Sequence, residues 1–120
     1  HSNNFSMLRN LNLPLLDQVI PALLQDLDSR GLLDSTLVVV MGEMGRTPKV
    51  NASAGRDHWP QCFTTYFAGG GIQGGRAIGR SDPNGGYPAE RAVEPSEVTN
   101  YAQKRAVHEE HEVLCLRGFR

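Results

Sequence analysis

The chain is poor in cysteine, in excess charge of one sign and in long apolar runs. Its two cysteines, Cys62 and Cys115, stand far apart without a C-x-x-C pair, which argues against a disulfide framework and a zinc knuckle. Twelve Lys and Arg against thirteen Asp and Glu give a net charge of -1, so we expect no nucleic-acid partner and no anionic lipid surface. Because no apolar stretch approaches the roughly 20 residues of a membrane span, we also expect no such span.

What is present fits one compact domain. The 120 residues lie within the usual size range of a single domain. Hydrophobic residues make up 39% of the chain, and 13 glycines accompany them. This composition is compatible with an ordinary globular protein.

The first third of the chain predicts an amphipathic helix. Its apolar positions recur every three or four residues and fall on one helical stripe, namely Leu15, Leu16, Val19, Ile20, Leu23, Leu24 and Leu27. Pro14 is tolerated in a first helical turn, and Gly31 is a typical C-terminal stop. Pro21 lies inside the pattern, so a kink or a restart of the helix is expected there.

The strands are predicted from β-branched and aromatic runs. LVVVM, Leu37–Met41, has no polar alternation and predicts a strand that is covered on both faces. A second strand is expected over Cys62–Ala68, an irregular β-hairpin around Ile72–Ile78, and a last helix beginning at Ser96. A helix followed by a buried strand indicates an α/β layer architecture.

The stretch GEMGRTPKVNASAGRDHWP follows this first strand and is rich in chemically active side chains. In a parallel α/β sheet, sites gather beyond the carboxyl ends of the strands, where Glu43 would stand. Asp57 and His58 come fourteen positions later and can fold back towards Glu43. Carboxylate and imidazole suit zinc, manganese or iron, and Arg46 and Lys49 can hold an anion.

The same stretch has a second interpretation. It can be a solvated loop whose arginines pair with Asp57 and whose Trp59 packs as a lid on the core. Composition and position leave both interpretations open.

The order of motifs G-E-x-G-R-T-P, G-R-D-H-W-P, A-G-G-G-I and G-G-x-x-I-G closely resembles a known family. With HSNNF before them, these motifs are similar to the C-terminal part of the bacterial domain-of-unknown-function family numbered 1501, from His1 to about Val98. That family resembles a branch of the alkaline phosphatase and sulfatase superfamily. The resemblance implies a partial alkaline-phosphatase-like α/β sandwich for residues 1–98.

The resemblance also implies a site and a location. Relatives bind divalent metals at strand ends and hydrolyse phosphate or sulfate esters, so zinc, manganese or calcium is the expected cofactor and a small anionic ester the expected substrate. The expected metal ligands are His1, Glu43, Asp57 and His58, with Arg46 and Lys49 holding the anion. The resemblance further suggests an exported protein, periplasmic or extracellular, whose signal lies upstream of this chain.

Two departures from the family pattern define the alternatives. The nucleophile of the superfamily lies on upstream strands and has no counterpart in these residues, and residues 99–120 form a divergent tail that suggests a disrupted reading frame. The chain is therefore expected to be a hydrolase fragment that contributes part of a metal site. The alternatives are a non-catalytic module that binds anions or serves export, and a gene remnant without function.

Overall fold

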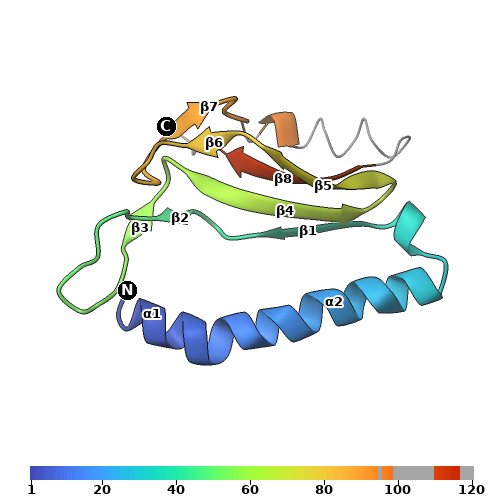
Figure 1. Ribbon diagram of the computed structural model, residues 1–120, viewed down its shortest axis with the longest axis horizontal. Coiled ribbons are helices and arrows are strands. Elements are labelled where there is room, and N and C mark those ends of the chain that lie inside the picture. Colours follow the sequence, from blue (N-terminus) through green and yellow to red (C-terminus); the bar gives the residue numbers. More distant parts are fainter. Residues whose placement is uncertain (95, 99–109, 117–120) are drawn as a thin grey trace.

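The fold is a mixed α/β arrangement in which one long helical segment runs alongside a small sheet (Figure 1). The computed structural model describes residues 1–94, 96–98 and 110–116. The helical segment consists of α1 (Asn4–Met7), a π-helical turn (Leu8–Asn12) and α2 (Leu13–Ser29), and a short 3-10 turn follows at Leu33–Ser35. The strands are β1 (Leu37–Met41), β2 (Gly45–Arg46), β3 (His58–Trp59), β4 (Phe63–Gly69), β5 (Ile72–Ile78), β6 (Arg80–Ser81), β7 (Pro88–Glu90) and β8 (Glu110–Leu116).

The two prolines of the helical segment are accommodated in different ways. Pro14 lies in the first turn of α2, directly after the π-helical turn, where the Leu13 amide donates to the Leu8 carbonyl. Pro21 stands inside α2, which continues as one helix to Ser29, so the predicted restart of the helix is wrong. The helix ends at Ser29, and Gly31 just beyond it has a φ of 66°, the left-handed conformation that glycine favours after a helix end.

Replacing Pro21 with Ala is expected to stabilise α2, because an interior proline removes one backbone hydrogen bond and costs a helix about 3 kcal/mol. The thermal midpoint should therefore rise, whereas the far-ultraviolet circular dichroism at 222 nm, a wavelength characteristic of helix, should change little, because α2 is already one helix through Pro21. Gln18→Ala, an exposed change in the same helix, is the control. A markedly stronger helical signal in Pro21→Ala would mean that the helix of the unmodified protein is broken at Pro21 in solution.

The apolar stripe of α2 is present but is not packed into a core. Ile20, Leu24 and Leu27 are half-buried, whereas Val19 is 61% exposed and the other members of the stripe are also exposed. No residue of α2 is buried. The amphipathic pattern therefore identifies the helix, but within the described residues only part of its apolar face is covered.

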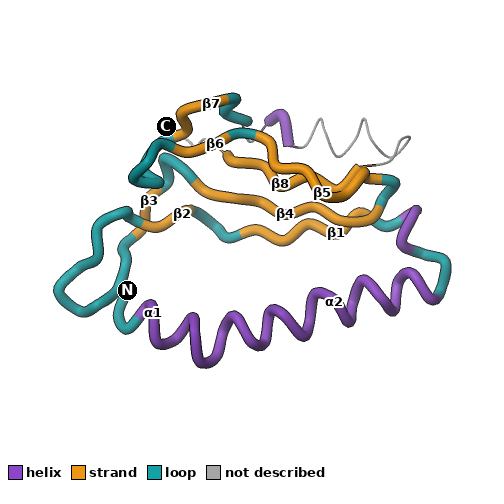
Figure 2. The backbone as a smooth tube through the Cα atoms, in the orientation of Figure 1, coloured by secondary structure: helices purple, strands orange, loops and turns teal. Residues whose placement is uncertain are grey.

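The main sheet has four strands in the order β1-β4-β8-β5 (Figure 2). β1 pairs antiparallel with β4, with Val39 opposite Phe67, and β4 pairs antiparallel with β8. Among the strands that the structure describes, only β5 and β8 pair in parallel, so the expected parallel sheet is wrong for β1. β1 lies at the sheet edge with Val39 and Met41 exposed, so it is not covered on both faces.

A run of three glycines turns the chain between β4 and β5. Gly69, Gly70 and Gly71 all have φ between 59° and 72°, which L side chains rarely adopt. The Gly70 amide donates to the Leu33 carbonyl at 2.8 Å, so this turn is held against the 3-10 turn that precedes β1. The predicted hairpin at Ile72–Ile78 is instead strand β5, and β8 lies between it and β4.

The hydrophobic core is small and lies on the sheet. Phe67, Ile72 and Ile78 are its buried members, and Leu37, Phe63, Val93 and Val98 pack against them as partly buried residues. The strand predicted at Cys62–Ala68 corresponds to β4, which carries Phe67. Burial is therefore concentrated on β4 and β5, the two strands that flank β8 and are joined by the glycine turn.

Two short antiparallel ribbons extend from the sheet, one formed by β2 and β3 and the other by β6 and β7. Residues 96–98 are helical, and the rest of the helix predicted from Ser96, like the start of the predicted tail, falls on residues 99–109, outside the described residues. In the described part of the chain, no helix has both the length and the apolarity that a membrane crossing needs. The alkaline-phosphatase-like sandwich stays a prediction.

Candidate functional site

The ribbon of β2 and β3 brings the two halves of the GEMGR to GRDHW stretch together. Arg46 lies opposite His58 in the pairing register, and the Thr47 amide donates to the Asp57 carbonyl at 2.9 Å. The Thr47 hydroxyl accepts from the Asp57 amide at 3.0 Å and donates to the Lys49 carbonyl at 2.8 Å. Asp57 and His58 therefore return beside Arg46 and Thr47.

The N-terminal segment docks onto the loop that joins β2 to β3 (Figure 1). The amides of Asn3 and Asn4 donate to the carbonyls of Ser53 and Ala54 at 3.0 and 2.9 Å. Gly55 is buried against the His1 backbone, and a Cβ at this position would overlap the His1 carbonyl group. This close approach places His1 next to Asp57, although 56 positions separate them in the chain.

Two imidazoles and one carboxylate form the centre of this site, which we call the His1 cluster: His1, Asp57 and His58. The His1 Nδ1 lies 3.1 Å from the Asp57 Oδ1, and the side chains of His1 and Asp57 are 58% and 55% exposed. The rings of His1 and His58 lie 4.7 Å apart between centroids, with an interplanar angle of 38°. Donors that suit a metal ion are thus gathered in one accessible place.

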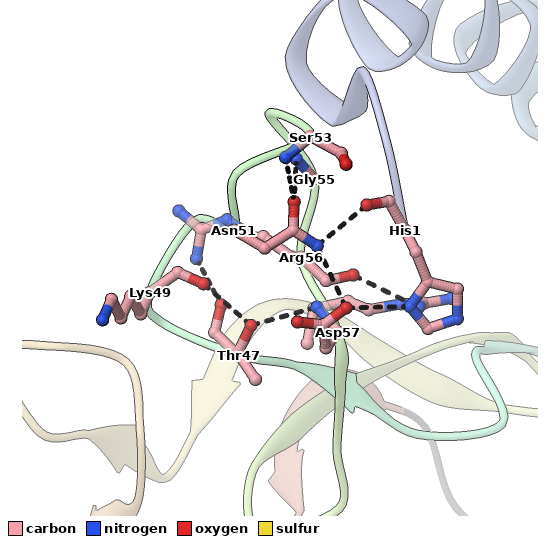
Figure 3. A network of polar contacts seen from close by, with 9 residues as sticks. His1, Thr47, Lys49, Asn51, Ser53, Gly55, Arg56 and Asp57 are labelled. Carbon is pink, nitrogen blue, oxygen red and sulfur yellow. Dashed lines mark hydrogen bonds and ion pairs between the residues drawn. The ribbon is translucent and has the colours of Figure 1, made fainter.

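Asn51 connects the parts of the site and was not identified as a site residue from the sequence. Its Nδ2 donates to the His1 carbonyl at 2.9 Å and to the Asp57 Oδ1 at 3.0 Å, as Figure 3 shows. Its Oδ1 accepts from the amides of Ser53 and Gly55 at 3.0 and 2.9 Å. The only sequence signal for Asn51 is weak. Asparagine side chains in loops often form hydrogen bonds with nearby backbone amides, and most loops with such bonds have no functional site.

The remaining predicted residues lie around the His1 cluster rather than in it. Glu43 is exposed, and no hydrogen bond or ion pair joins it to the cluster among the described contacts. Arg46 is exposed, and its Nη1 donates to the Arg56 carbonyl at 3.5 Å. Lys49 lines a hollow of about 350 Å³ together with Thr47, Val50, Asn51, Ala52 and Asp57.

The described contacts disagree with the solvated-loop interpretation in two respects. Among the described residues, neither arginine of the stretch forms an ion pair with Asp57. Arg56 instead donates to the Thr47 carbonyl and lies 5.5 Å from the centre of the Phe5 ring. Trp59 does not cover the core as a lid. Its Nε1 donates to the Gly86 carbonyl at 2.6 Å and its ring meets Tyr87 edge-on, so it fixes the glycine-rich turn at residues 82–87.

The chemistry of the donors fits a metal ion in part. Imidazole nitrogen is a preferred ligand of zinc, whereas calcium takes oxygen ligands, so the cluster suits zinc better than calcium. Over residues 1–94, 96–98 and 110–116, no group of three or more His, Cys, Asp or Glu side chains is arranged to hold an ion. The His1 cluster therefore offers fewer direct ligands than the four residues predicted from the sequence.

Comparison with known proteins gives one match. No curated protein and no solved structure matches the chain. The family model described as "Protein of unknown function (DUF1501)" matches residues 1–114, and thus also includes part of the predicted tail. Because that match covers nearly all of the 120 residues, the chain belongs to the DUF1501 family.

Proposed function

We propose that this chain supplies part of the metal site of a metal-dependent hydrolase that acts on phosphate or sulfate esters. The observation that carries the proposal is the His1 cluster, in which segments 56 positions apart bring two imidazoles and a carboxylate together at the surface. A folded core gains little from such a cluster, because its polar groups are exposed and need no internal partners. Binding of an ion would explain why these side chains are held close together at the surface.

The role of each residue follows from its position. His1 and His58 would hold the ion, with zinc favoured by their nitrogen donors. A bound divalent cation would polarise an oxygen of the ester and assist the attack on it. Lys49 lines the hollow beside Asp57 and would receive the anionic part of the ester, while Arg46 lies opposite His58 on the neighbouring strand.

Zinc is expected to raise the thermal midpoint of the purified protein relative to the same protein in chelator. A ligand that binds only the folded state adds about 2.7 kcal/mol of stability at roughly 100 times its dissociation constant. His58→Ala should abolish the zinc-dependent rise, whereas Asp17→Ala, which removes an exposed carboxylate in α2, should leave it intact. Manganese and calcium should give smaller shifts.

The same measurement decides the predicted role of Glu43. If Glu43→Ala removes the zinc response, Glu43 is a ligand that approaches the cluster when metal binds. If the zinc-dependent rise of the thermal midpoint persists in Glu43→Ala, Glu43 is not a metal ligand. If zinc, manganese and calcium all leave the thermal midpoint of the unmodified protein unchanged, the proposed metal site is refuted.

A second candidate function has support from the hollow beside Asp57. Lys49 lines it, so a cation is available to an anion without any metal, whereas the side chains of Thr47 and Asn51 already donate to other groups. Titration with inorganic phosphate and with sulfate in the presence of chelator tests this non-catalytic function. Binding that persists in chelator and is lost in Lys49→Ala would favour an anion-binding module over a hydrolase.

A further inference from the structure

The hydrogen bond between His1 and Asp57 defines which ring nitrogen carries the proton. A carboxylate oxygen accepts hydrogen bonds, so in this contact the His1 Nδ1 is the donor to the Asp57 Oδ1, 3.1 Å away. In a neutral imidazole with a proton on Nδ1, the Nε2 carries the lone pair. The contact therefore selects Nε2 as the metal-binding atom of His1.

The Asp57 carboxylate is itself held in position. Asn51 Nδ2 donates to the same Oδ1 at 3.0 Å, so this oxygen receives two hydrogen bonds. The Asp57 amide donates to the Thr47 hydroxyl, and its carbonyl accepts from the Thr47 amide. Because the backbone and the carboxylate of Asp57 are fixed by separate partners, the carboxylate has little freedom to turn away from His1.

Asn51 also fixes the backbone that carries the imidazole. Its Nδ2 donates to the His1 carbonyl at 2.9 Å, while its Oδ1 is occupied by the amides of Ser53 and Gly55. A single carboxamide thus joins the loop, the N-terminal residue and the carboxylate (Figure 3). Four hydrogen bonds use its full capacity at this half-buried position, which leaves it one orientation.

We infer that Asp57 and Asn51 are positioning residues that hold His1 in its Nδ1–H tautomer and so leave the lone pair of its Nε2 free to bind a zinc-like cation. The inference rests on the proposed metal site for the identity of the ligand. It changes the expected role of Asp57 from a direct ligand to a carboxylate that orients a histidine ligand, an arrangement common in zinc proteins.

The tautomer can be measured without any metal. Long-range proton–nitrogen correlation of the ¹⁵N-labelled protein in chelator, at about pH 8 where imidazole is neutral, reports which nitrogen of each ring is protonated. We expect the His1 ring to be protonated at Nδ1. Asp57→Ala removes the acceptor of the His1 Nδ1–H, so the Nδ1–H population of His1 should fall.

Two further variants separate positioning from folding. Asn51→Ala should reduce the Nδ1–H population of His1, whereas Ser53→Ala keeps the backbone amide that Asn51 uses and should leave the tautomer unchanged. The backbone amide spectrum of each variant verifies that the fold persists. A His1 ring protonated mainly at Nε2 in the unmodified protein would overturn the inference, as would an Asp57→Ala variant whose His1 stays protonated at Nδ1 to the original extent.

Zinc titration of the same proteins distinguishes failure of the inference from failure of the proposed function. Loss of an outer carboxylate should weaken zinc binding by roughly 10- to 100-fold, so Asp57→Ala should still bind zinc, whereas His58→Ala should not. If Asp57→Ala loses zinc as completely as His58→Ala, Asp57 is a direct ligand and the inference is wrong. If the unmodified protein binds no zinc but shows the Nδ1–H tautomer, the metal site is refuted while the positioning of His1 by Asp57 stands.

Discussion

Phe67→Ala is expected to lower the free energy of unfolding by about 3–5 kcal/mol, the usual cost of removing a buried aromatic ring. Phe67 is fully buried at the centre of the core and lies opposite Val39 in the sheet, while Ile72 and Ile78 belong to the same cluster. Domains are stable by only about 5–15 kcal/mol in total. With so few buried apolar side chains described, this one change should remove much of the stability.

Urea unfolding followed by circular dichroism measures the effect, and Val19→Ala in α2 is the matched control. Val19 is 61% exposed, so its truncation should change stability by less than about 0.5 kcal/mol. Equal midpoints for the two variants would show that the core does not depend on Phe67. If the unmodified protein itself unfolds without a cooperative transition, the alternative of a gene remnant gains support.

Gly55→Ala is expected to detach the N-terminal segment from the site. The added Cβ would overlap the backbone carbonyl group of His1, and backbone cannot move aside as a flexible side chain can. Separation would break the contact of His1 with Asp57 and the bond from Asn51 to the His1 carbonyl. We therefore expect the zinc-dependent stabilisation to disappear, together with a loss of roughly 1–3 kcal/mol in stability from overpacking.

Gly42→Ala is the control for this prediction. Its Cβ would lie 3.5 Å from the Met44 carbonyl oxygen, an ordinary contact, so the variant should behave like the unmodified protein. Thermal unfolding with and without zinc, and hydrogen exchange over residues 51–57, measure both expected effects. Retained zinc stabilisation in Gly55→Ala would mean that His1 is not needed for the metal site.

The sequence determined the elements whose signals are local. The run Leu37–Met41 is β1 over its full length, and the apolar repeat from Leu15 to Leu27 lies within α2. Gly31 ends that helix as predicted, because a left-handed residue is needed there and glycine adopts it at no steric cost. The family was also determined by sequence, since its motifs are short and contiguous.

Only the tertiary structure decided how these elements combine. β4 pairs with β8, a partner near the other end of the chain, and the direction of β1 is set by β4, so neither follows from hydrophobic periodicity. The meeting of His1 with Asp57 depends on the close approach that Gly55 permits and on the four hydrogen bonds of Asn51. The sequence shows which side chains are able to bind an ion or form hydrogen bonds. The distances between those side chains depend on long-range backbone packing, which composition and spacing do not encode.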